Sequence, residues 1–144
     1  MNHLLVSFLL LISSNSLASE KSISITVKPS TGIVGTISFN IHPDQSVTVL
    51  VYESASIINE SSVSIDSKTV AKVSQLSEQI LDEFVSLKDY SQFPEYKQGS
   101  AIAITQSKVT KSISTRRYSE KLISLIETIK DYVPKEYKPQ LEKK

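Results

Sequence analysis

The sequence predicts an α+β domain in which an antiparallel meander of three or four strands precedes a helix, a β-hairpin and a second helix. From residue 22 to residue 65, apolar and polar side chains alternate, as they do in strands with one buried face. In residues 67–88 and 119–133, apolar side chains recur every three or four positions, as they do in amphipathic helices. Since each helix has one apolar face to bury, we expect both helices to pack on one face of the sheet.

The composition is that of one ordinary globular domain. The chain has 144 residues, 40% hydrophobic and 22% charged, which is enough for a core of its own. Its 16 basic and 15 acidic side chains nearly cancel, so no strong field attracts nucleic acid. The absence of cysteine excludes disulfides, thiolate metal sites and a cysteine nucleophile. We therefore expect no cofactor and no nucleic-acid partner, and the sequence leaves the oligomeric state open.

The N-terminus has the pattern of a secretory signal. Residues 4–12 form an apolar run, and the small residues Ser16 and Ala18 follow it, which favours cleavage after Ala18. The run is shorter than the roughly 20 apolar residues that span a bilayer, so we expect no membrane span in the mature chain. No Lys or Arg precedes the run, and the alternative is a strand or helix of the core. The signal predicts a periplasmic or secreted protein.

The strands come first in the mature chain. Residues 22–28 and 35–41 alternate, residues 46–53 alternate with Leu50 and Tyr52 apolar on the second face, and residues 57–65 form a weaker fourth candidate. The apolar positions expected to face the core are Ile23, Ile25, Val27, Ile37, Phe39, Ile41, Val47, Val49 and Val51. The turn residues at 29–32 separate the first two runs. Short links between successive runs predict antiparallel pairing of neighbours.

The first helix is expected over residues 67–88, with Asp66 or Ser67 as its N-cap. Its apolar face consists of Val70, Val73, Leu76, Ile80, Phe84 and Leu87. Residues 89–99 then read as a polar and aromatic loop. Two short strands are expected in residues 101–115, around a turn at 106–108.

Ser119 has the position of an N-cap for the second helix. The apolar face of this helix consists of Leu122, Ile126, Ile129 and Val133, and Pro134 ends it. The single domain is thus expected over residues 19–133. Residues 134–144 are expected to form a charged tail that frays.

The tripeptide His42-Pro43-Asp44 matches the one with which J-domain co-chaperones stimulate their Hsp70 partner. In a J-domain it lies between two helices, whereas strand patterns flank it here, so we interpret it as a type I turn. His42 is also the only histidine after the predicted signal, which argues against a zinc site. No Gly-x-Ser-x-Gly motif accompanies it, so we predict no catalytic residue at this turn.

Carboxylate chemistry is the alternative that spacing leaves open. Glu78 and Asp82 share one face of the first predicted helix, although a solvated surface is the ordinary interpretation of such a pair. A pair of Asp or Glu side chains brought together by the fold would suit a small hydrolase.

The candidate binding residues lie in the predicted loop. Tyr90, Phe93 and Tyr96 stand in a stretch without periodicity, interrupted by proline, and loop aromatics are typical anchors of protein interfaces. The alternative is that the rings fold back onto the end of the sheet. Arg116 and Arg117 belong to a local basic cluster and are expected to flank the aromatic anchors. The sequence thus predicts a partner surface formed by these five residues.

A signal segment, a cysteine-free chain, a strand meander, a helix, a hairpin and a closing helix occur in this order over residues 20–133. This layout resembles small periplasmic immunity and inhibitor proteins of Gram-negative bacteria. The resemblance implies a non-enzymatic exported protein that binds another protein, such as a toxin or hydrolase that attacks the cell envelope. The alternative function is a small periplasmic hydrolase that uses an Asp/Glu pair.

Overall fold

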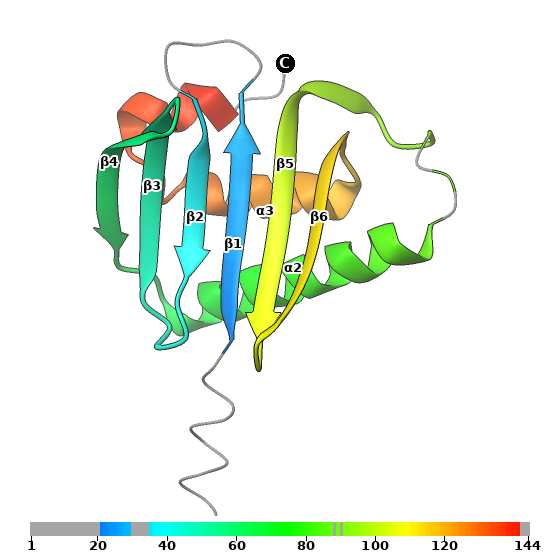
Figure 1. The fold of residues 1–144 in the computed structure, drawn as a ribbon, viewed down its shortest axis with the longest axis horizontal. Helices are drawn as coiled ribbons and strands as arrows, with labels where there is room; N and C mark the ends of the chain where they lie inside the picture. Colours follow the sequence, from blue (N-terminus) through cyan, green and yellow to red (C-terminus); the bar gives the residue numbers. More distant parts are fainter. Residues whose placement is uncertain (1–20, 30–34, 88, 90, 142–144) are drawn as a thin grey trace, which may run out of the picture.

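A computed structural model of the chain describes residues 21–29, 35–87, 89 and 91–141. Six strands form one antiparallel sheet in the order β4-β3-β2-β1-β5-β6, and α2 and α3 lie against the same face of it (Figure 1). The predicted α+β class is therefore confirmed. The predicted signal segment, residues 1–18, lies outside the described residues.

The elements follow the predicted order. They are β1 (Ser22–Lys28), β2 (Ile37–Ile41), β3 (Val47–Glu53), β4 (Ser56–Val63), α2 (Ser67–Ser86), β5 (Glu95–Gln106), β6 (Val109–Arg117), α3 (Glu120–Lys130) and η1 (Lys135–Leu141). The weaker fourth run of the sequence is a strand, so the meander has four strands. Asp66 is the N-cap of α2, where its carboxylate accepts a hydrogen bond from the backbone N–H of Thr69 at 3.1 Å.

The hairpin of β5 and β6 joins the sheet beside β1, the first strand of the chain. Ile25 on β1 stands opposite Phe39 on β2 and opposite Ile102 on β5. The helix α2 connects the outer strand β4 to β5 and crosses the sheet on the way (Figure 1). Consequently β1 lies inside the sheet, with a strand on each side.

The core lies between the sheet and the two helices. The apolar positions predicted for the first three strands are all buried, and Phe39 is the largest of the fully buried side chains. Val73 and Ile80 on α2 and Leu125 on α3 bury their side chains completely from the other side. Burial of this kind contributes about 1.5–3 kcal/mol for each large apolar side chain.

The predicted loop at residues 89–99 is wrong in its second half, because β5 begins at Glu95. The polar residues Gln98 and Ser100 take buried positions on this strand, so the apolar alternation that marks a strand is missing. A register shift between Glu95 and Ser100 also interrupts the pairing with β6. The sequence therefore carries little local signal for the start of β5.

The expectation of a frayed tail does not hold for residues 135–141. These residues form the 3₁₀ helix η1, which contacts α3, and Leu141 is only 1% exposed. Tyr137, four residues earlier, is half-buried against the core. Two apolar side chains of this charged segment thus pack against the domain.

The turn interpretation of His42-Pro43-Asp44 is confirmed. The backbone N–H of Gln45 donates to the carbonyl of His42 at 2.8 Å, which closes the turn between β2 and β3. The carboxylate of Asp44 accepts from the hydroxyl of Ser46 at 2.6 Å and from its backbone N–H at 3.0 Å. These bonds hold the pKa of Asp44 below its usual value, as expected for an Asx-type turn.

Tyr118 connects the end of β6 to β5 inside the domain. Its ring is 3% exposed, and its hydroxyl lies 2.5 Å from the hydroxyl of Ser100. Burial raises the pKa of Tyr118 above its usual value of about 10. The two hydroxyls satisfy each other in a site that water does not reach.

We expect Tyr118→Phe to lower the free energy of unfolding by about 1–3 kcal/mol at neutral pH, because the buried hydroxyl of Ser100 loses its partner. The raised pKa means that the unfolded chain releases this proton first as the pH rises, so its contribution to stability is present below pH 10 and is lost above it. Urea unfolding of both proteins from pH 7 to pH 11 measures this. The stability difference between wild type and Tyr118→Phe should shrink above about pH 10. A difference that is constant with pH would contradict the assignment.

Candidate functional site

The face of the sheet opposite the helices carries mostly short side chains on β1, β2, β5 and β6, whereas β3 adds the larger Leu50 opposite Ser38. Its residues include Ser24 and Thr26 on β1, Ser38 and Asn40 on β2, Ala101 and Ala103 on β5, and Ser112 and Ser114 on β6. In the described part of the chain, neither α-helix lies on this face (Figure 1). We call it the open face. Along β1, β5 and β6 the side chains of the open face are short, so longer residues at the strand ends project beyond them.

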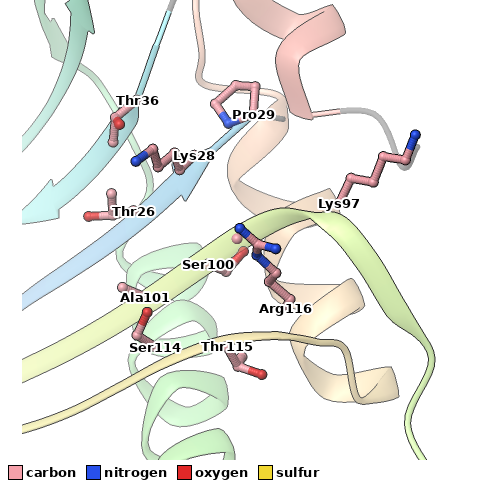
Figure 2. Close-up of a pocket in the computed structure, with 11 residues that line it drawn as sticks. Thr26, Lys28, Pro29, Thr36, Lys97, Ser100, Ala101, Ser114, Thr115 and Arg116 are labelled. Carbon is pink, nitrogen blue, oxygen red and sulfur yellow. The ribbon is translucent and has the colours of Figure 1, made fainter. Parts of the chain in front are cut away.

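A cavity of about 710 Å³ lies at one end of the open face, where β1 ends and β5 begins. Lys28, Lys97 and Arg116 bring positive charge to its lining, and Thr26, Thr36 and Ser114 bring hydroxyl groups. Figure 2 shows that these side chains come from β1, β5 and β6 and from the residue before β2. We call this cavity the cationic pocket.

The strand register explains why the cationic pocket is hollow. Lys28 stands opposite Gly99, and Thr26 stands opposite Ala101, which in turn faces Ser114. A methyl group at Gly99 would meet no atom within 4 Å, so the space above this position is open. Small residues on β5 therefore form a floor between longer side chains on its two neighbours.

Positive charge is spread across the cationic pocket. Figure 2 shows Arg116 on β6, the ammonium of Lys28 reaching towards Thr36, and Lys97 extending outwards at the rim. The described residues that line it include no carboxylate. The lining can thus donate hydrogen bonds to an anion and offset its charge.

Arg116 and Arg117 lie on opposite faces of β6, as consecutive strand residues do. Arg116 lines the cationic pocket. The guanidinium of Arg117 donates to the carbonyl oxygen of Phe93 at 3.0 Å and lies 3.5 Å from a carboxylate oxygen of Glu95. Arg117 therefore fixes the segment before β5 to β6, and the structure separates the two arginines that the sequence groups together.

The predicted aromatic anchors pack against the domain. The ring centroid of Phe93 lies 5.7 Å from that of Phe84, and Tyr96 meets Tyr118 edge-on at 4.9 Å. Both rings are half-buried against the core, as in the alternative in which they fold back onto the sheet. Tyr90 lies outside the described residues. Contact of these rings with a partner stays a prediction.

Lys28 and Lys97 are pocket residues that the sequence does not single out. Lys28 continues the open-face positions of Ser24 and Thr26, so the alternation of β1 places it correctly. Lys97 falls in the segment predicted to be a loop. What brings the two lysines to Arg116 is the pairing of β1 with β5 and of β5 with β6.

Glu78 and Asp82 lie side by side on α2 in the lining of a second cavity of about 450 Å³, together with Lys111 of β6. Both carboxylates are exposed, and Glu78 forms an ion pair with Lys21. Exposed carboxylates with lysine neighbours are typical of a solvated surface.

In the part of the chain that the structure describes, no three His, Asp or Glu side chains lie together as metal ligands would. Nor does any helix there have the length and apolar character needed to cross a membrane.

A comparison with models of known protein families finds no match, and no curated protein is significantly similar in sequence. The function therefore has to be argued from the site and the fold.

Proposed function

We propose that the chain is an exported, non-enzymatic binding protein, and that it inhibits or neutralises a toxin or hydrolase acting on the cell envelope. The observation that carries the proposal is the cationic pocket on the open face of the sheet. Its lining consists of hydrogen-bond donors, small residues and positive charge, which suit recognition of a complementary surface. The hydroxyl groups of its lining can both donate and accept hydrogen bonds.

The scaffold around the pocket supports binding without rearrangement. Lys28 is paired with Gly99, whereas Lys97 and Arg116 lie in the short stretch between the Glu95–Arg117 and Ser100–Thr115 pairs, so paired positions flank both residues. Arg117 and the half-buried rings of Phe93 and Tyr96 stiffen the segment that leads into Lys97 and Gly99. Preorganised sites lose less conformational entropy on binding than mobile loops do.

The proposal of export rests on the sequence. The apolar run at residues 4–12 followed by Ser16 and Ala18 has the pattern of a cleaved signal. A cysteine-free domain with a core of its own needs no disulfides in an oxidising compartment. The mature protein would then meet its partner outside the cytoplasm.

The test starts with the full chain, carrying a C-terminal tag, expressed in a Gram-negative host. We expect protein recovered from the periplasm to begin at Ser19, as measured by intact mass. Used as bait on envelope extracts, it should capture a hydrolytic enzyme or toxin in a 1:1 complex. One equivalent of the bait should abolish the activity of that protein.

The control separates inhibition from catalysis. The bait should release no product from envelope substrates on its own. Turnover by the bait, or a captured protein whose activity is unchanged by it, would overturn the proposed function. Retention of Met1 would overturn the export step alone.

A further inference from the structure

We propose that the cationic pocket binds an extended acidic segment of the partner protein, with carboxylates on alternate residues. This inference rests on the proposed function and names the chemistry of the contact. The occupant would lie across β1, β5 and β6 rather than along one of them. Arg116 would be its central contact, with Lys28 and Lys97 on either side.

The separation of the charges favours several carboxylates over one compact anion. Lys28 and Arg116 stand on β1 and β6, with β5 between them, and neighbouring strands are about 4.8 Å apart. The backbones that carry these charges are thus roughly 10 Å apart. Carboxylates on alternate residues of an extended chain recur about every 7 Å, within reach of such long side chains.

The floor of the pocket favours an anion that is carried on a carbon chain. Pro29, Ala101 and the methyl groups of Thr26 and Thr36 offer apolar surface between the cations. The methylene groups of a glutamate side chain can lie on this surface while its carboxylate reaches Arg116. The threonine hydroxyls can donate to backbone carbonyls of the segment and accept from its N–H groups. A phosphate polymer would leave the apolar surface unused.

The position of the pocket favours a flexible segment over a rounded protein surface. The open face around it carries serine, alanine and threonine, whose short side chains let a peptide backbone approach the sheet. Because Gly99 and Ala101 have no bulky side chains, the peptide backbone can come closest to the sheet at the centre of the pocket.

The test uses a synthetic octapeptide of alternating glutamate and serine, blocked at both ends, and the same peptide with glutamine for glutamate. NMR titration of the full mature chain at low salt should shift the backbone amides of Gly99, Ala101 and Ser114 with the glutamate peptide only. Lys28→Gln combined with Arg116→Gln should weaken binding about tenfold, since two exposed charge pairs are lost. Gly99→Val should also weaken binding by filling the pocket, without altering the circular dichroism spectrum.

The matched control is Lys108→Gln combined with Lys121→Gln. It removes the same charge from exposed positions outside the pocket and should leave the affinity unchanged. Equal weakening by both pairs would mean that net charge alone attracts the peptide, and the inference would be wrong. Tighter binding of inositol hexakisphosphate or of phosphatidylglycerol vesicles at the same amides would overturn the choice of a protein segment.

A captured partner also separates this inference from the proposed function. If the partner binds the Lys28→Gln/Arg116→Gln protein as tightly as wild type, the pocket is not its contact, although inhibition can still hold. If the peptide binds as described but no inhibited partner exists, the proposed function is wrong.

Discussion

Replacing Phe39 by alanine is expected to lower the free energy of unfolding by about 3–5 kcal/mol. Phe39 is fully buried on β2, where it stands opposite Ile25 of β1 and Val49 of β3. Truncation removes the largest fully buried side chain among the described residues and leaves a cavity among neighbours whose strands are paired on both sides. Because a domain of this size has a stability of about 5–15 kcal/mol, about a fifth or more of it would be lost. Urea unfolding followed by circular dichroism measures the change.

Two controls test the geometry behind this expectation. Phe39→Leu retains much of the side-chain volume and should cost less than Phe39→Ala. Asn40→Ala changes the next residue of β2, which faces the open side of the sheet, and should have a smaller effect than Phe39→Ala. An unchanged denaturation midpoint for Phe39→Ala, with a large effect at Asn40, would mean that β2 is turned the other way.

The sequence predicts best those elements in which apolar residues keep a regular spacing, every second residue in a strand or every third or fourth residue in a helix. Residues 22–28 alternate throughout, and the predicted strand coincides with β1. In α2, the apolar spacing from Val70 to Phe84 and the capping carboxylate of Asp66 predict both the face and the first turn. These features depend on residues within a few positions of each other, which is why sequence alone contains them.

The local sequence pattern does not show which strands pair when they lie far apart in the chain. The neighbourhood of Lys28 depends on β5, which pairs with β1 from more than 70 positions later in the chain. The sequence therefore predicts Arg116 as a binding residue but not the lysines that line the same cavity. Buried Gln98 and Ser100 hide the start of β5 for a different reason, since their polar side chains remove the apolar alternation.

The C-terminal segment gives the second large expected effect. We expect Leu141→Ala to lower the free energy of unfolding by about 2–5 kcal/mol, because Leu141 is 1% exposed at the end of η1. The value should lie towards the lower end, since a segment close to the chain end can relax around a smaller side chain more easily than β2 can. Urea unfolding of the full mature chain measures it.

Glu136→Ala is the matched control, because it changes the same short helix at an exposed residue, and surface substitutions usually shift stability by less than about 0.5 kcal/mol. A chain that ends at Pro134 should lose at least as much stability as Leu141→Ala, since it lacks Tyr137 as well. If Leu141→Ala and the shortened chain both unfold like wild type, the charged segment frays as its composition suggests. If both are destabilised while Glu136→Ala is not, the two apolar side chains attach the segment to the domain, and the functional fold extends beyond residue 133.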